Sequence, residues 1–256
     1  MQIGTAAPTP SELAVAPHHF IHHISIQDNY SVGSFEKHAL KTISELHKTN
    51  NIVVLVGGSG LYVDAVNKGL DYFPKVDPEI RTSLNQQLEQ NGIEHLQNKL
   101  KTLDIESYNT IAIDNPHRII RALEICIGTG KPYASFLNKD KQKRPFKSIT
   151  IGLMADRPII YNRINQRVDI MVQQGLLKEV EQLIPHKNLN ALNTVGYKEL
   201  FNYFNEQCTL EFALEEIKKN SRRFAKRQLT WFKRNKNTQW FDYKTSFNTI
   251  IKSLEL

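Results

Sequence analysis

Residues 52–56 and the glycine-rich turn after them restrict the fold of this chain more than any other feature. The run Ile52–Val56 is uninterrupted and apolar, which is typical of a strand buried on both faces of a parallel sheet. Gly57-Gly58-Ser59-Gly60 comes next, and we expect a short helix from there to Gly69. A strand, a glycine turn and a helix in succession form one α/β unit, so the sequence predicts an α/β fold.

The turn Gly57–Gly60 is also a candidate anion-binding site. Glycine residues let the backbone approach an anion closely, and the free N–H groups at the start of a helix attract negative charge. Ser59 adds a hydroxyl that can donate to a phosphate or help to hold Mg²⁺. A tight turn with no ligand explains the same residues equally well. The chain contains no G-x-x-x-x-G-K-S/T phosphate loop.

Helix start and stop signals mark a middle segment of different character. Asp77-Pro78 and Asn115-Pro116 each combine a capping residue with a proline at the first helical position. We expect the first of these helices to stop at Gly92, with more helix through Leu103, and the second to stop at Gly128. The middle of the chain is therefore predicted to be helical.

The chain divides into three segments on this basis. Residues 70–143 form a predicted all-helical insertion domain, and residues 1–69 and 144–256 form the two parts of the core. In the core we expect helices at residues 32–48, 157–174 and 209–234, and further strands at residues 148–153 and 239–243.

Positive charge is concentrated in one segment. The 256 residues carry a net charge of +7, and nine lysines and arginines with no acid lie between Lys218 and Lys236, which leaves −2 for the rest. Ile217, Phe224 and Trp231 recur every seven residues and predict the apolar stripe of a helix. A solvated helix face normally mixes charges of both signs, so we favour binding to a phosphate backbone over a passive solvated face.

Two other polar clusters have less decisive patterns. Arg163 and Arg167 are four residues apart on one predicted helix face, so an anion between them or a nearby acid such as Asp169 would relieve their repulsion. His18, His19, His22 and His23 are dense enough for a zinc site, but no cysteine or carboxylate lies among them. We therefore favour ordinary packing or surface roles for the histidines.

The composition excludes several classes of protein. The chain is 40% hydrophobic and 23% charged, as ordinary soluble globular proteins are. Its longest apolar run is far shorter than the roughly 20 residues of a membrane helix, and no secretory signal is present. Cys126 and Cys208 have no metal-type spacing. We expect a cytoplasmic protein with no membrane partner.

The motifs, taken in order, resemble those of the tRNA dimethylallyltransferase family, which transfers isopentenyl groups to tRNA. The resemblance covers nearly the whole chain. It rests on Ile3-Gly4-Thr5-Ala6, Pro17-His18-His19, Tyr30-Ser31-Val32, Gly57-Gly58-Ser59-Gly60-Leu61-Tyr62, Asp77-Pro78-Glu79-Ile80-Arg81, Asn115-Pro116-His117-Arg118 with Arg121-Ala122-Leu123-Glu124, Arg163-Ile164 with Arg167, Val195-Gly196-Tyr197-Lys198, and Ala225-Lys226-Arg227-Gln228 with Thr230-Trp231-Phe232.

The resemblance implies both a fold and a reaction. The implied fold is a P-loop NTPase-like parallel-sheet core with an all-helical insertion domain, and tRNA lies between the two. The implied reaction moves a dimethylallyl group from dimethylallyl diphosphate to N6 of the adenosine beside the anticodon of tRNA, with Mg²⁺ as cofactor. We expect a monomer.

The resemblance also implies roles for individual residues. The predicted catalytic residues are Ser59, Arg163 and Arg167, and the predicted diphosphate-binding residues are Gly57, Gly58, Ser59, Gly60 and Arg163. The predicted tRNA contacts are Ser59, Arg81, His117, Arg118, Ile119, Ile120, Arg121, Tyr197, Lys226, Arg227, Gln228, Thr230, Trp231 and Lys233. The only metal contact that the resemblance suggests is between the Ser59 hydroxyl and Mg²⁺.

The chain departs from the family pattern in three places. The family begins with a strand, a Walker A-type loop and an Asp-Ser segment whose Asp is the proposed general base, and this sequence starts after them. His22 replaces the usual Asp, and His117 replaces the usual Gln. We therefore expect a truncated sequence with weak or no activity. The alternatives are a non-catalytic tRNA-binding remnant and a different nucleotide-dependent transferase or kinase.

Overall fold

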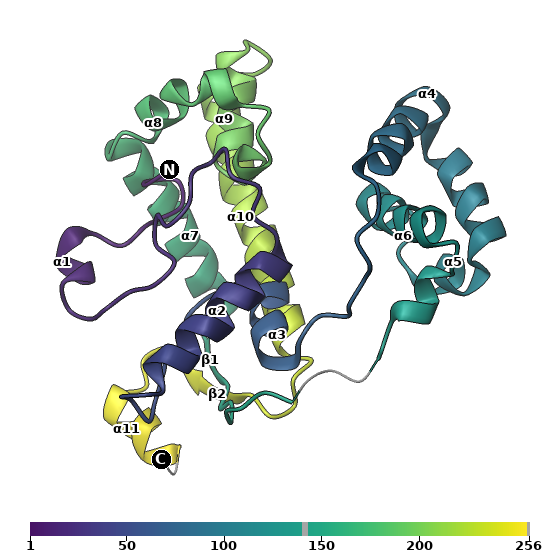
Figure 1. Ribbon diagram of the computed structural model, residues 1–256. Coiled ribbons are helices and arrows are strands. Elements are labelled where there is room, and N and C mark those ends of the chain that lie inside the picture. The colour runs from purple at the N-terminus through teal and green to yellow at the C-terminus, as the bar shows by residue number, and fades with distance from the viewer. Residues whose placement is uncertain (140–142, 255–256) are drawn as a thin grey trace. The chain divides into compact units, whose positions relative to one another are not determined.

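The computed structural model describes residues 1–139 and 143–254, which form two compact units (Figure 1). The core unit comprises Met1–Val63 and Lys147–Leu256, and the helical unit comprises Asp64–Phe146. The predicted boundaries after residues 69 and 143 lie a few residues from these. No helix in the described part of the chain is long and apolar enough to cross a membrane.

In its described part, the core unit contains a small parallel sheet and eight α-helices or parts of α-helices. Its elements in chain order are α1 (Pro10–Leu13), α2 (Val32–Leu46), the start of α3 (Gly60–Lys68), β1 (Ile151–Met154), α7 (Arg157–Gln173), α8 (Leu176–Gln182), the 3₁₀ turns η2 (Ile184–His186) and η3 (Asn190–Leu192), α9 (Tyr197–Phe204), α10 (Leu210–Phe232), β2 (Gln239–Asp242) and α11 (Phe247–Ser253). The expected helices and the strands near residues 148–153 and 239–243 are present.

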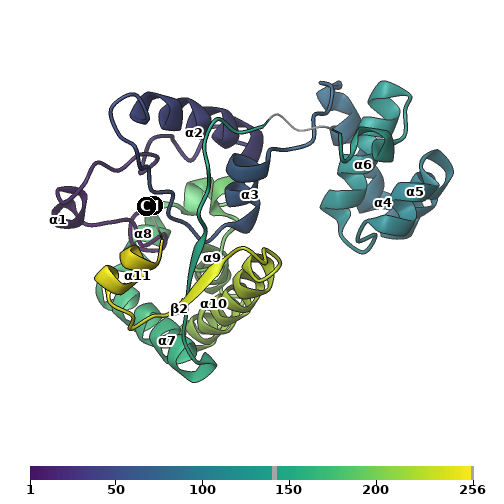
Figure 2. The ribbon, with the colours of Figure 1, turned by 90° about the horizontal axis from the view of Figure 1, so that it is seen from below.

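The sheet confirms the predicted α/β class. β1 pairs with β2 in parallel, with Ile151 opposite Gln239. In the view of Figure 2, α2 lies above the two strands, and α7 and α10 lie below them. The chain between β1 and β2 contains α7 to α10, and a helical crossover between parallel strands is typical of the α/β class.

The run Ile52–Val56 does not form a strand, so this prediction is wrong. Val54 is 77% exposed and Val56 is 86% exposed. A buried strand needs ladder partners for its backbone N–H and C=O groups, and the described sheet consists of β1 and β2 alone. Leu153 on β1 is exposed as well, so the sheet leaves apolar side chains uncovered.

The main hydrophobic core of this unit lies among its helices. It is formed by Val168, Leu176, Val180, Leu192, Tyr197, Leu200, Phe201, Ala213 and Ile217. On α10 the predicted apolar stripe is buried at Ala213 and Ile217, whereas Phe224 is 43% exposed. The N-terminal half of α10 therefore packs in the core, and the C-terminal half extends beyond it.

A carboxylate on α8 fastens the N-terminal loop to this core. The backbone N–H groups of Gln2 and Ile3 donate to Glu179 Oε2 at 2.7 and 2.9 Å, and that of Gly4 donates to Oε1 at 3.1 Å. The buried Tyr197 hydroxyl donates to Oε1 at 2.6 Å. Burial acts to raise the pKa of Glu179, but these four hydrogen bonds outweigh it and the pKa is lowered.

The glycine turn packs against α10. Gln228 Nε2 donates to the Gly58 carbonyl oxygen at 3.0 Å. A β-carbon at Gly58 would overlap the Gln228 amide, and one at Gly60 would overlap the Trp231 indole, whereas one at Gly57 would meet nothing. Two of the three glycines are therefore explained by close packing against a helix.

The helical unit confirms the predicted insertion domain as all-helical in its described part. It contains the rest of α3, α4 (Pro78–Leu103), α5 (Ile105–Thr110), α6 (Pro116–Thr129) and the 3₁₀ turn η1 (Tyr133–Phe136). The Asp77 side chain accepts from the N–H of Glu79 at 2.9 Å, and Asn115 caps α6 in the same way. Gly92 interrupts α4 with a φ of 74°, as its predicted stop implies.

The predicted stop of α6 at Gly128 is wrong. The helix continues to Thr129, and Gly130 ends it with a φ of 66°, in the left-handed region that favours glycine. Gly128 has a different role, because a β-carbon there would meet Val76. The packing core of this unit consists of Leu84, Leu96, Leu100, Ile119, Ile120, Ala122, Leu123 and Cys126.

Replacing Glu179 with Gln should destabilise the core unit by about 1–3 kcal/mol at pH 7, because acceptors for several N–H and O–H donors are lost. A carboxyl with a lowered folded-state pKa stabilises the fold above its ordinary value of 4.5, and this contribution disappears as the pH falls through the folded-state pKa. The difference between wild type and variant should therefore shrink in acid. Urea unfolding followed by tryptophan fluorescence measures this, because both tryptophans lie in the core unit.

Glu181→Gln is the matched control, because Glu181 lies exposed on the same helix. It should leave the free energy of unfolding unchanged. Equal stability of the Glu179 and Glu181 variants at pH 7 would contradict the assigned role of Glu179.

Gly60→Ala should lower stability by about 1–3 kcal/mol, because the new methyl group overlaps the Trp231 ring. It should also change the emission maximum of Trp231. Gly57→Ala places a methyl group in open space and should be close to neutral. If both variants unfold at the same denaturant concentration, the described packing of the turn is wrong.

Candidate functional site

The glycine turn presents a serine and unpaired N–H groups at the start of α3. Ser59 is exposed, and its carbonyl oxygen accepts the N–H groups of Tyr62 and Val63 at 2.9 and 3.1 Å. Its hydroxyl forms no hydrogen bond with another described residue, and neither do the N–H groups of residues 57–61. Groups of this kind at a helix N-terminus are suited to an anion such as a diphosphate.

The cations of α10 fall into two groups. Lys218 pairs with Asp169 at 2.9 Å and with Glu215 at 3.1 Å, and Lys219 pairs with Glu216 at 2.5 Å. Nearby acids on α7 and α10 therefore neutralise Lys218 and Lys219, the first two lysines of the acid-free segment. The cations from residue 222 onward form no ion pair with an acid among the described residues.

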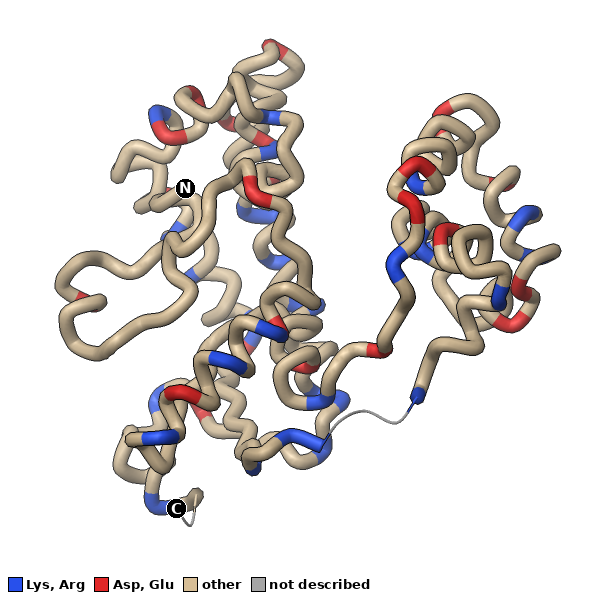
Figure 3. The backbone as a smooth tube through the Cα atoms, in the orientation of Figure 1, with Lys and Arg blue, Asp and Glu red and all other residues tan. Residues whose placement is uncertain are grey.

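The second group of cations defines what we call the cationic end of α10, comprising Arg222, Arg223, Lys226 and Arg227 with Lys233, Arg234 and Lys236 just after the helix. Figure 3 shows Lys and Arg as repeated blue segments along α10. The Arg227 guanidinium lies 5.8 Å from the Phe224 ring centroid, and that of Arg234 lies 5.0 Å from Trp231. Arginine beside an aromatic ring is suited to both the phosphates and the bases of RNA.

The cationic end of α10 and the glycine turn share one surface region. Gln228 and Trp231, which contact the turn, lie between the exposed Lys226, Arg227, Thr230 and Lys233 in the sequence of α10 and its end. The structure therefore brings together two motifs that are 170 residues apart in the chain.

Arg163 and Arg167 are both exposed on α7, which lies beside α10. The Asn165 side chain on α7 accepts a hydrogen bond from Arg222 at 2.7 Å. Asp169, which we considered as a partner for the two arginines, pairs with Lys218 instead. The Arg163 guanidinium lies 5.6 Å from the Tyr243 ring, and no ion pair joins either arginine to a described acid. Both remain able to bind an anion.

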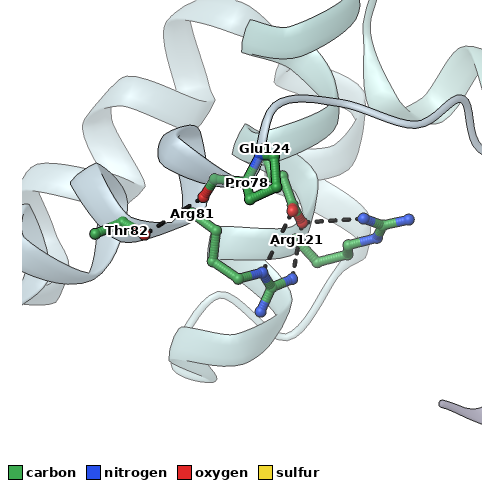
Figure 4. A network of polar contacts seen from close by, with 5 residues as sticks. All are labelled: Pro78, Arg81, Thr82, Arg121 and Glu124. Atoms are coloured by element: carbon green, nitrogen blue, oxygen red, sulfur yellow. Dashed lines mark hydrogen bonds and ion pairs between the residues drawn. The ribbon is translucent and has the colours of Figure 1, made fainter. Parts of the chain in front are cut away.

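The helical unit holds a second group of predicted site residues (Figure 4). His117 and Arg118 are exposed in the first turn of α6. Arg81 on α4 and Arg121 on α6 both bond to Glu124, at 2.7 Å from Arg81 Nη2 and 2.9 Å from Arg121 Nη1. Burial acts to raise the pKa of Glu124, but its hydrogen bonds from Arg81 and Arg121 outweigh it and the pKa is lowered.

Three residues predicted to contact tRNA have buried side chains. Ile119 and Ile120 lie in the hydrophobic core of the helical unit, and Tyr197 lies in that of the core unit, where its hydroxyl bonds to Glu179. All three are neighbours in sequence of exposed or half-buried polar residues. Helical periodicity turns them inward, since adjacent residues lie on different sides of a helix.

The histidine cluster does not form a metal site among the described residues. No group of three His, Cys, Asp or Glu side chains there could hold a metal ion. His18 contacts the Ala16 carbonyl at 2.7 Å, His22 contacts the Met1 carbonyl at 3.0 Å, and His23 packs edge-on against Phe20. The separate partners agree with the packing and surface roles that we favoured.

The sequence did not predict two acids that each bind several partners, Glu124 and Glu179. Glu124 follows Arg121 by three residues on a helix, and this spacing was a usable signal for an ion pair. Glu179 gave no such signal, because its partners Gln2, Ile3 and Gly4 are more than 170 residues away.

Comparison with protein families and with curated proteins matches this chain to transferases. The family model described as IPP transferase matches residues 1–235. A tRNA dimethylallyltransferase from Christiangramia forsetii is 59% identical over 255 residues, which are 100% of this chain and 84% of that protein.

Solved structures of two transferases match this chain as well. The full-length tRNA isopentenylpyrophosphate transferase from Bacillus halodurans is 36% identical, with a TM-score of 0.69 over 99% of this chain and 80% of that one. A eukaryotic dimethylallyltransferase acting on tRNA shares the fold, with 22% identity and a TM-score of 0.80 over 97% of this chain and 67% of that one. The chain belongs to the IPP transferase family.

Proposed function

We propose that this protein transfers a dimethylallyl group from dimethylallyl diphosphate to the exocyclic N6 of the adenosine beside the anticodon in tRNA. The observation that carries the proposal is the packing of the glycine turn against the cationic end of α10. That packing places groups suited to a diphosphate next to a surface suited to RNA. The relatives named above are dimethylallyl and isopentenylpyrophosphate transferases of tRNA, which favours a tRNA prenyltransferase over a non-catalytic RNA-binding remnant or a kinase.

In the proposed reaction, the N6 lone pair attacks C1 of the dimethylallyl group. The C1–N6 bond forms as the C1–O bond breaks, the diphosphate leaves with the bonding electron pair, and the proton lost from N6 passes to solvent water. Charge develops on the departing diphosphate, where fixed positive groups stabilise the transition state. Arg163, Arg167 and the N–H groups of residues 57–61 supply this stabilisation.

The tRNA is bound by residues of both units. In the core unit these are Ser59, Lys226, Arg227, Gln228, Thr230, Trp231 and Lys233, and in the helical unit they are Arg81, His117, Arg118 and Arg121. The target base leaves its stack so that N6 can reach the allylic carbon. We expect the protein to act as a monomer in the cytoplasm.

If Mg²⁺ is the cofactor, the diphosphate oxygens of the substrate and the Ser59 hydroxyl would hold it. Mg²⁺ is commonly held by substrate phosphates and a small number of protein oxygens. The exposed Ser59 hydroxyl, which is free of other described partners, fits such a role. When bound, the ion neutralises charge on the leaving group.

A single-turnover assay tests the proposed function. The full chain, in excess over unmodified tRNA, is incubated with Mg²⁺ and dimethylallyl diphosphate labelled in the allyl group. We expect slow labelling of adenosine N6, in line with the weak activity expected from the sequence, with release of one diphosphate per modified tRNA. If no label enters tRNA over a range of enzyme and substrate concentrations, the proposal is wrong.

Arg163→Ala should slow transfer by about 100-fold, as expected for loss of one group that stabilises a developing anion. The KM for dimethylallyl diphosphate should rise, and the affinity for tRNA should change little. Arg157→Ala is the control, because Arg157 is an exposed arginine on the same helix and has no predicted role. Equal rates for the two variants would contradict the assignment of Arg163.

Replacing Lys226 and Arg227 with Ala should weaken tRNA binding and flatten its salt dependence. Each lost phosphate contact lowers the slope of log K against log salt by about 0.7–0.9. Lys219→Ala serves as the control on the same helix, because Glu216 already neutralises Lys219. Binding titrations at several salt concentrations give the slopes. A larger effect from Lys219 than from the double variant would overturn the division of α10 into two groups.

A further inference from the structure

Glu124 is a buried acid between two partly exposed arginines in the helical unit. Its side chain is 9% exposed, whereas those of Arg81 and Arg121 are 45% and 39% exposed. It accepts from Arg81 Nε at 3.3 Å, from Arg81 Nη2 at 2.7 Å and from Arg121 Nη1 at 2.9 Å. Figure 4 shows the two guanidiniums reaching this carboxylate from different helices.

The cluster keeps a net positive charge. One carboxylate faces two guanidiniums, and the lowered pKa of Glu124 keeps it ionised at neutral pH. A guanidinium has five N–H donors, of which Arg81 uses two and Arg121 uses one on Glu124. The remaining donors belong to side chains that reach solvent, so the pair can bind an anion while still bound to Glu124.

An aromatic pair restrains Arg121 from a second direction. Its guanidinium carbon lies 5.1 Å from the Phe73 ring centroid, and Phe73 stacks on Tyr133 with centroids 4.9 Å apart and planes 8° from parallel. A side chain held by both a carboxylate and a ring has little freedom left to lose when it binds a ligand. Groups ordered in advance bind more tightly than mobile groups with the same charge.

We propose that Glu124 is a positioning residue for RNA binding, which holds Arg81 and Arg121 as a fixed pair of guanidiniums directed at phosphate oxygens of the tRNA. The proposal rests on the proposed function, because it takes tRNA as the substrate. It assigns Glu124 no contact with RNA. A carboxylate would repel a phosphate backbone, so its value for binding lies in the geometry that it imposes.

Glu124→Gln separates positioning from simple electrostatics, because the two predict opposite signs. Removal of an acid makes the unit more positive, so charge alone would tighten tRNA binding. Loss of the carboxylate also frees both arginines, so positioning predicts binding weaker by about tenfold. Fluorescence anisotropy with labelled tRNA at fixed salt measures the dissociation constant. The KM for tRNA should rise while that for dimethylallyl diphosphate stays unchanged.

Glu89→Gln is the matched control, because Glu89 is an exposed acid on α4 of the same unit. It changes the net charge by the same amount and should leave binding unchanged or slightly tighter. A Glu124→Gln variant that binds tRNA as tightly as wild type, or more tightly, would overturn the proposal.

Glu124→Asp decides the matter if the Gln variant fails to fold, as judged by thermal unfolding followed by circular dichroism. Aspartate keeps the charge, but it is one methylene shorter and cannot reach both arginines in the same way. We expect weaker tRNA binding at unchanged net charge, and wild-type affinity would overturn the proposal. If wild-type protein itself binds no tRNA, the proposed function fails, whereas wild-type binding with unaffected variants rejects the role of Glu124 alone.

Discussion

The close packing of the glycine turn against α10 is the contact on which the rest of the candidate site depends. Gln228 fixes the carbonyl group of Gly58, and Trp231 lies where a side chain at residue 60 would otherwise be. The N–H groups at the start of α3 are thereby held beside the cationic end of α10. Neither motif alone distinguishes a ligand site from an ordinary turn or a solvated helix, but their contact supplies the missing context.

Which positive charges remain available for binding depends on ion pairing as well as on the sequence. Lys218 and Lys219 are neutralised by nearby acids, whereas the cations from Arg222 onward form no ion pair with a described acid. In the helical unit Glu124 compensates one of two arginine charges and orders both. Acids in both units therefore determine which positive groups remain available to an anionic partner.

Much of the fold follows from local signals in the sequence. Ser31, Asp77, Asn115 and Thr209 cap helices as their residue types predict, because each side-chain oxygen accepts an N–H group of the first turn. The exposed run Ile52–Val56 could not be predicted in this way. Apolar composition indicates a strand only when partner strands lie on each side, and pairing is a property of the whole sheet.

The parts of the candidate site that depend on neighbouring residues in the sequence could be predicted. Exposed cations near the end of α10 and on α6 could be identified from charge and helix position, whereas the inward direction of Ile119, Ile120 and Tyr197 depends on packing. The link between Glu179 and the N-terminal loop joins Gln2 to a residue 177 positions away. No local pattern indicates a contact of this range.

Lysine footprinting tests most directly the claim that the cationic end of α10, beside the glycine turn, forms the RNA-binding face of the core unit. The protein is acetylated with and without unmodified tRNA, and the modified lysines are quantified by mass spectrometry. We predict strong protection of Lys226 and Lys233 and unchanged reactivity of Lys178, which is exposed on α8. Protection of Lys178 with full reactivity at Lys226 and Lys233 would contradict the account.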